Sequence, residues 1–224
     1  MSLTLILLAA GDGNRMGMKT PKQFHKLKNG KLVIDLTLEA YSGITNISET
    51  IVSFNPKHGV HLGSELQYVE GGETRQQSVY KALKHVQTDH VLIQDTARPL
   101  VARQSILDCM AELSNGSLAV QTVVPTHSTT LEISGLATIK VHNRGSIVLP
   151  QCPIGFNTEI IKACYEKVVQ TDVEYHDDIS LALSEMPKLN VAFVAGCQAG
   201  FKLTYPEDFD LLEAFLMRES KHEK

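Results

Sequence analysis

The sequence contains no C-x-x-C pair, no long apolar run and no excess of positive charge. Its four cysteines are scattered, which argues against a disulfide framework or zinc site and favours reduced thiols in a cytoplasmic protein. The apolar run 3–8 is too short to span a membrane, and no basic segment with a cleavage site opens the chain. The net charge of −4 gives no general attraction to nucleic acid. We therefore expect neither a membrane nor a nucleic-acid partner.

The 224 residues, of which 43% are hydrophobic, suffice for a substantial core. No repeat, low-complexity tract or linker divides the chain, so we expect a single domain over residues 1–224. Residues 126–150 differ in texture, because they contain two short alternating runs, 129–133 and 137–141, around Ser134-Gly135. This pattern predicts an inserted β-hairpin. Because a lone hairpin is marginal in water, we expect it to pack on a partner.

The segment 3–24 is the most informative stretch of the sequence. Residues 3–8 form an apolar run typical of a strand buried on both faces, and the chain then breaks at Ala9-Ala10. The following loop combines glycines with cations, namely Gly11, Gly13, Gly17, Arg15, Lys19 and Lys22. Small residues let a ligand approach the backbone, and backbone N–H groups and cations attract phosphates. The segment therefore predicts an anion site at the carboxyl edge of a sheet.

Three known motifs can be compared with this loop. A P-loop requires Gly-x-x-x-x-Gly-Lys-Ser/Thr, which does not occur here. A dinucleotide fingerprint would need glycine in place of Met16, and Pro21 would interrupt its helix. The nucleotidyltransferase pattern, small-small-Gly-x-Gly-x-Arg-Met followed by Pro-Lys, matches from Ala9 to Lys22. A basic glycine-rich turn without function is the simpler alternative.

Two further strand ends carry polar residues. Strand 67–70 runs into Gly71-Gly72 and a helix, an arrangement that suits a contact to a base or phosphate. The buried strand 90–94 is followed by Asp95, where a carboxylate could hold Mg²⁺ together with substrate phosphates and water. The alternatives are an ordinary turn in the first case, and helix capping or pairing with Arg98 in the second.

The remaining pattern alternates helices with strands. Helices are expected at 32–41, 103–113, 156–169 and 177–186 and from Pro206 to about residue 218, and strands at 49–54, 118–124 and 190–194. Such alternation predicts an α/β fold with a mostly parallel, twisted sheet.

Taken in order, the motifs resemble one family. AAGDGNRMG with PKQF, GGETRQQSV, QDTARP, the hairpin with Thr129 and Arg144, and FKLTYPEDF are similar to the 2-C-methyl-D-erythritol 4-phosphate cytidylyltransferases and the related ribitol-5-phosphate enzymes. The resemblance covers essentially the whole chain. It implies a Rossmann-like fold with helices on both faces of the sheet and a hairpin that serves as a dimer arm. It also implies transfer of a cytidylyl group from CTP to a sugar-alcohol phosphate with Mg²⁺ in a homodimer, for isoprenoid precursor synthesis.

The resemblance also implies roles for individual residues. Arg15, Lys22 and Lys202 would be catalytic and neutralise the reacting phosphates. Asp95 would hold Mg²⁺ beside the nucleotide, and Thr129 and Arg144 would bind the substrate phosphate of the other subunit. The remaining nucleotide-binding positions would be Ala9, Ala10, Gly11, Gly13, Gly72, Glu73 and Ser78. Arg75 and Arg98 would have supporting roles.

Several positions depart from the family pattern. Gln94 and Thr96 flank Asp95, Ser128 precedes Thr129, Cys152-Pro153-Ile154 replaces Thr-Pro-Gln, and Ala199 stands where an acidic residue is common. Most of these changes concern the acceptor or the metal. Two alternatives therefore stay open: a cytidylyltransferase for ribitol phosphate or another polyol phosphate, and a nucleotide-binding protein without turnover.

Overall fold

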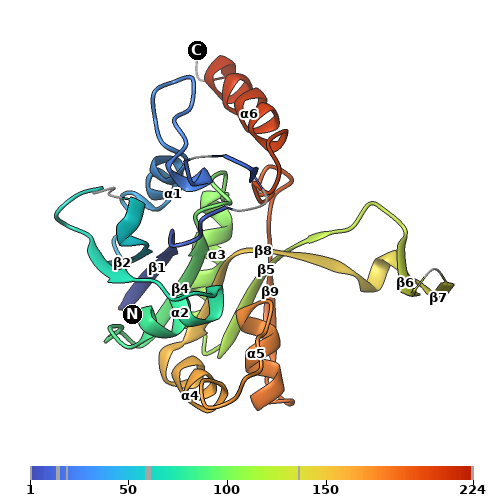
Figure 1. Ribbon diagram of the computed structural model, residues 1–224. Coiled ribbons are helices and arrows are strands. Elements are labelled where there is room, and N and C mark those ends of the chain that lie inside the picture. The colour runs from blue at the N-terminus through green and yellow to red at the C-terminus, as the bar shows by residue number, and fades with distance from the viewer. Residues whose placement is uncertain (1, 14–15, 19, 59–61, 136, 223–224) are drawn as a thin grey trace.

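The computed structural model describes residues 2–13, 16–18, 20–58, 62–135 and 137–222 (Figure 1). Its main sheet has seven strands in the order β3-β2-β1-β4-β8-β5-β9, and β6 and β7 form a separate two-stranded sheet. The strands of the main sheet are β1 (Leu3–Leu8), β2 (Ile47–Phe54), β3 (Gln67–Glu70), β4 (His90–Asp95), β5 (Ala119–Pro125), β8 (Val148–Asn157) and β9 (Val191–Ala195). Strand β8 is antiparallel to both neighbours, and the other pairings are parallel. The predicted mostly parallel α/β sheet is confirmed.

Helices cover both faces of the sheet, as predicted. They are α1 (Val33–Tyr41), α2 (Arg75–Leu83), α3 (Arg103–Ser114), α4 (Thr158–Val168), α5 (Asp178–Glu185) and α6 (Asp208–His222). Side chains of α2, α4 and α5 pack with Ile6 in one core cluster, whereas those of α1 and α3 pack with Leu5 and Leu7 in a second. Successive side chains of β1 point to opposite faces of the sheet, so β1 contributes to the core on both sides. A third cluster joins α1 to α6 through Leu36 and Leu212.

The hairpin β6 (Thr130–Ser134) and β7 (Ala137–His142) projects from the body, as Figure 1 shows at the ends of β5 and β8. A 3-10 helix, η4 (Arg144–Ser146), follows it. Strand β8 pairs with β5 from Val148 onward, so the last residues of the predicted insertion 126–150 already belong to the sheet. The hairpin itself was predicted correctly.

The sequence interpretation missed β8 and placed a helix from residue 156. Phe156 and Asn157 instead end β8, and α4 begins after Asn157, whose side chain accepts a hydrogen bond from the Ile160 N–H. Pro150 and Pro153 argue against a strand at the sequence level. Proline has no backbone N–H to donate to a neighbouring strand, and it is rare in central strands.

Side chains of β5 bond to β8 where the ladder is interrupted. The pairing register shifts between Gln121 and Val123 of β5. There the Gln121 amide donates to the Gln151 carbonyl at 2.7 Å, and the Thr122 hydroxyl donates to the Pro153 carbonyl at 2.7 Å. These bonds satisfy buried carbonyls that regular pairing would otherwise serve.

Candidate functional site

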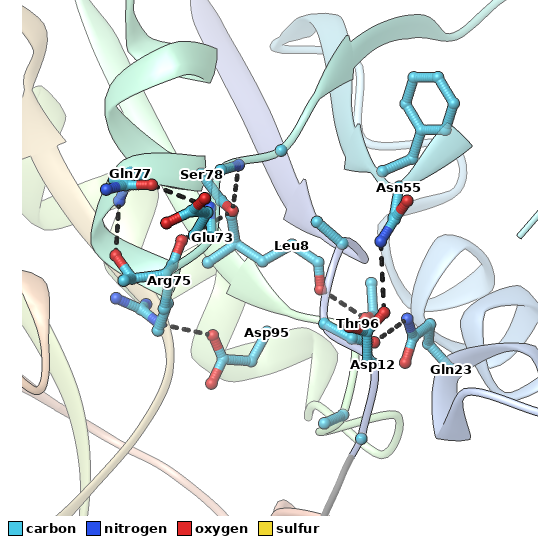
Figure 2. Close-up of a pocket in the computed structure, with 18 of the residues that line it drawn as sticks. Leu8, Asp12, Gln23, Asn55, Glu73, Arg75, Gln77, Ser78, Asp95 and Thr96 are labelled. Atoms are coloured by element: carbon cyan, nitrogen blue, oxygen red, sulfur yellow. Dashed lines mark hydrogen bonds and ion pairs between the residues drawn. The ribbon is translucent and has the colours of Figure 1, made fainter. Parts of the chain in front are cut away.

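A cavity of about 960 Å³ lies at the carboxyl edge of the parallel strands. The loops after β1, β2, β3 and β4 all contribute to it, because parallel strands end at the same edge. The segment before α6 adds Lys202 and Thr204. Figure 2 shows side chains that line the cavity, with Arg75 directed at Asp95 and Asn55 directed at Asp12. The cavity therefore lies at the edge of the sheet for which the sequence predicts an anion site.

The first loop is shaped by Gln23 of the 3-10 helix η2 (Lys22–Phe24). The buried Gln23 amide donates to the carbonyls of Ala9 at 2.7 Å and Gly11 at 2.8 Å. Gly13 has a φ of 72°, a left-handed conformation that glycine adopts without strain. Together these features bend the chain away from β1 and turn it around the edge of the cavity.

The Gly71-Gly72 turn requires glycine for lack of space. A Cβ atom at Gly71 would collide with the Ala10 methyl group, and one at Gly72 would collide with the Gln77 side chain. The Ser78 hydroxyl accepts from the Gly72 N–H at 3.0 Å and donates to the Thr74 carbonyl at 2.9 Å. The turn therefore approaches the first loop closely and closes one wall of the cavity.

The N-terminus of α2 faces the same cavity. Thr74 caps the helix by accepting from the Gln77 N–H at 3.2 Å, and Gln77 Oε1 accepts from the Glu73 N–H at 2.9 Å. A helix N-terminus presents partial positive charge, which favours a bound anion.

Charged groups meet at the end of β4. Oδ1 of Asp95 accepts from Arg75 Nε at 3.1 Å, and its Oδ2 accepts from Lys202 Nζ at 2.6 Å. Burial would raise the pKa of Asp95, but Arg75 and Lys202 beside it hold that pKa well below its usual range. The carboxylate is therefore ionised, and it pairs with Arg75 rather than with Arg98, the alternative partner.

Arg98 instead anchors neighbouring backbone. Its guanidinium donates to the carbonyls of Gly200 at 3.0 Å and Pro150 at 3.1 Å. Gln94, one of the residues that depart from the family pattern, donates to the Arg98 carbonyl at 3.2 Å and accepts from the Tyr41 hydroxyl at 2.8 Å. A glutamine at this position therefore stiffens the turn after β4.

A magnesium ion is compatible with this donor set. Among the residues that the structure describes, no three His, Cys, Asp or Glu side chains form a group able to hold a metal. Asp95 offers an ionised carboxylate inside a cavity large enough for phosphates. Mg²⁺ commonly takes one or two protein carboxylates and completes its octahedron with phosphate oxygens and water.

The structure brings most predicted site residues together. Those that line the cavity are Ala10, Gly11, Gly13, Lys22, Gly72, Glu73, Ser78, Asp95 and Lys202. Ala9 is buried behind this wall, with its N–H bonded to the Ser53 carbonyl. Arg15 lies outside the described residues. Thr129 and Arg144 are exposed on the arm, where Arg144 donates to the His127 carbonyl at 3.3 Å.

Sequence reasoning missed several residues that hold the site in shape. Gln23 directly follows the Pro21-Lys22 pair of the motif, and this position was the available signal. Gln151 exchanges hydrogen bonds with the backbone of Cys197 at 2.8 and 3.2 Å. Asp178 binds Arg75 from a distant part of the chain. No spacing rule indicates contacts of this kind.

The fold and the cavity define a Rossmann-like α/β protein of the nucleotidyltransferase class, with a polar cavity at the carboxyl edge of its sheet. The family model for 2-C-methyl-D-erythritol 4-phosphate cytidylyltransferase (IspD) matches residues 3–218, and the chain belongs to this family.

Individual relatives agree. The 2-C-methyl-D-erythritol 4-phosphate cytidylyltransferase of Thermobifida fusca (strain YX) is 31% identical, with 94% of this chain and 91% of that protein covered. The crystal structure of the Thermus thermophilus cytidylyltransferase of the same name has a TM-score of 0.79 at 30% identity, covering 96% of this chain and 98% of that one.

A relative whose name refers to CDP-ribitol also matches. The bifunctional ribulose 5-phosphate reductase/CDP-ribitol pyrophosphorylase Bcs1 of Haemophilus influenzae is 29% identical over 96% of this chain. The chain spans 48% of that protein's length.

Proposed function

We propose that the protein transfers the cytidylyl group of CTP to 2-C-methyl-D-erythritol 4-phosphate and releases pyrophosphate, a step in isoprenoid precursor synthesis. The observation that carries this proposal is the cluster of Asp95, Arg75 and Lys202 at the end of β4, in one cavity with Lys22 of the first loop. Family membership and the names of the relatives supply the substrates.

The reaction needs positioning and charge neutralisation. A phosphate oxygen of the acceptor attacks the α-phosphorus of CTP, a new P–O bond forms, and the bond to the β-phosphate oxygen breaks. Because the nucleophile is already an anion, no general base is needed. Lys22 and Lys202, with Arg15 as a further candidate, would neutralise the charge that builds up on the transferring group. Lys202 would exchange Asp95 for the α-phosphate.

Asp95 would hold Mg²⁺, which supplies further neutralisation of the triphosphate when bound. The segments around Ala10, Gly11, Gly13, Gly72 and Glu73, with the Ser78 turn, would receive the nucleotide, and the buried Ala9 would support this wall from behind. The close packing of Gly71 against Ala10 supports this role, because it leaves backbone rather than side chains at the wall. Base recognition by backbone N–H and C=O groups suits such a wall.

The arm would form a homodimer. Leu131 pairs directly with Val141 across the hairpin, and their side chains are 50% and 63% exposed. Ile133 and Ile139 are 64% and 59% exposed. Apolar side chains exposed to this degree on a two-stranded hairpin call for a covering surface. A second copy of the chain would provide it, and Thr129 and Arg144 would then reach the acceptor phosphate of that copy.

No described helix is both long and apolar enough to cross a bilayer. All four cysteines are free. Free thiols suit a reducing compartment, and we place the protein in the cytoplasm.

The second candidate is transfer to ribitol 5-phosphate or another polyol phosphate. The specific observations are the relative named CDP-ribitol pyrophosphorylase and the departures from the family pattern at Ser128, Cys152 and Ala199. The third is nucleotide binding without turnover, which Ala199 motivates.

Pyrophosphate release from CTP and Mg²⁺ with a panel of polyol phosphates separates these candidates. We expect the highest kcat/KM with methylerythritol phosphate. A higher value with ribitol phosphate would favour the second candidate. Measurable CTP binding with no release for any acceptor would favour the third.

A further inference from the structure

Behind the cavity lies a buried carboxylate that the proposed reaction does not use. Asp178 is the first residue of α5, and it is 0% exposed. Isolated charges in the interior are costly, so a buried carboxylate needs strong partners. Asp178 has two: its Oδ1 accepts from the Tyr165 hydroxyl at 2.6 Å, and its Oδ2 accepts from Arg75 Nη2 at 2.8 Å.

Arg75 connects this buried pair to the cavity. Its Nη2 is committed to Asp178, and its Nε donates to Oδ1 of Asp95 at 3.1 Å. The contact between Arg75 and Asp95 is visible in Figure 2. Asp95 then meets Lys202 through its second oxygen at 2.6 Å. The hydrogen bonds therefore run without interruption from Tyr165 in the core to Lys202 at the cavity.

The charges of this row balance. Two carboxylates, Asp178 and Asp95, alternate with two cations, Arg75 and Lys202. Burial would lower the pKa of Arg75, but Asp178 and Asp95 raise it, so the guanidinium is charged. Without Asp178, Arg75 would lack its interior partner. Its Nε–H and Nη2–H could then both donate to Asp95. A bidentate pair of that kind is strong, and it would occupy the oxygen that now faces Lys202.

We propose that Asp178, held by Tyr165, is a positioning residue that restricts Arg75 to one oxygen of Asp95. The other oxygen is thereby kept for exchange between Lys202 and a metal–nucleotide complex. The inference rests on the proposed function for the ligand, but the ordering of Arg75 can be observed without any ligand.

The first test uses the free protein. The Arg75 side chain is half-buried, and its Nε–H and Nη2–H each donate to a carboxylate. These bonds slow exchange of the Nε–H with water, so Arg75 should give a resolved Nε–H signal in ¹⁵N-edited NMR spectra. In Asp178→Asn this signal should broaden or disappear. The matched control is Asp177→Asn, since Asp177 caps α5 through the Ser180 N–H at 2.7 Å and asparagine also caps well. An unchanged Arg75 signal in Asp178→Asn would overturn the proposal, whatever reaction the protein catalyses.

The second test measures binding of Mn²⁺ with CTP by electron paramagnetic resonance and calorimetry. Loss of a residue that orients a metal ligand typically weakens affinity about 10- to 100-fold. We expect that loss for Asp178→Asn, a smaller one for Tyr165→Phe, and none for Asp177→Asn. Wild-type affinity in Asp178→Asn would show that Asp178 only balances the charge of Arg75 and does not position it for metal–nucleotide binding. Failure of the wild type to transfer cytidylyl groups would refute the proposed function but not this result.

A double variant separates positioning from packing. Arg75→Ala leaves the buried Asp178 carboxylate without its cationic partner. The thermal unfolding midpoint of this variant should therefore fall clearly. Adding Asp178→Asn should recover part of that midpoint while Mn²⁺–CTP affinity stays at the level of Arg75→Ala. Independent, additive losses of affinity would contradict action through Arg75.

Discussion

Lys22 Nζ donates a 2.6 Å hydrogen bond to the backbone carbonyl of Leu203, which lies 181 residues further along the chain. This contact ties the first loop to the segment that carries Lys202. Both ends of the sequence therefore contribute cations to one cavity, and the bond fixes the two segments relative to each other.

Replacing Lys22 should affect turnover far more than stability. Lys22→Ala removes the hydrogen bond from the Lys22 ammonium to the Leu203 carbonyl, and a bond from a charged donor is worth about 1.5–3 kcal/mol. Loss of a charge that stabilises the transition state should lower kcat by about 100- to 1,000-fold. Urea unfolding and steady-state kinetics measure the two effects. The control is Lys26→Ala, an exposed lysine nearby. Near-normal turnover of Lys22→Ala would remove Lys22 from the mechanism.

Gln23 should matter for the shape of the loop. Gln23→Met keeps the size of the side chain but leaves the carbonyls of Ala9 and Gly11 without this donor. The buried Ala9 carbonyl left unpaired costs about 1–3 kcal/mol, and the loop should lose its fixed form. We expect a lower urea midpoint and a raised Kd for CTP. Gln104→Met, on the exposed face of α3, should change neither value. Unaltered CTP affinity in Gln23→Met would show that the loop is shaped by other contacts.

Substitutions on the exposed apolar face of the hairpin β6–β7 should separate the two subunits of the proposed dimer. Ile133→Asp and Val141→Asp place carboxylates on the apolar face of the hairpin, where burial against a second copy would desolvate them. Sedimentation velocity should show monomers for the double variant and dimers for the wild type, with activity lost in parallel. Glu132→Gln, an exposed change on β6, is the control. A wild-type monomer with full activity would contradict the role of the arm.

Thiol chemistry should distinguish Cys197 from the buried cysteines. Burial raises the pKa of Cys109 to about 12 and that of Cys152 to about 11, so at pH 8 their thiolates are scarce. Only Cys197 is partly exposed. Labelling with a disulfide reagent at pH 8 should modify Cys197 first, and the remaining thiols only after unfolding. Rapid native labelling of Cys109, read by peptide mass spectrometry, would contradict the packing of α3 on β8.

The sequence allowed the fold class and much of the cavity to be predicted because strand ends and cations follow local rules. The run 3–8, the Gly71-Gly72 turn and Asp95 each lie in a short motif, and parallel strands bring such motifs to one edge. Strand β8 was missed because Pro150 and Pro153 contradict the usual pattern of a central strand, and their compensation comes from side chains of β5. Asp178 was missed because its partner Arg75 is 103 residues away, and only the folded chain brings them together.

The most direct test of the central claim follows the phosphorus atoms. The protein is incubated with CTP, Mg²⁺ and 2-C-methyl-D-erythritol 4-phosphate, and products are identified by ³¹P NMR and mass spectrometry. We predict a cytidine diphosphate ester of methylerythritol and one pyrophosphate per ester formed, with both formed far more slowly in Lys22→Ala. Pyrophosphate accompanied by CMP and no ester, or no consumption of CTP with any polyol phosphate, would contradict the account.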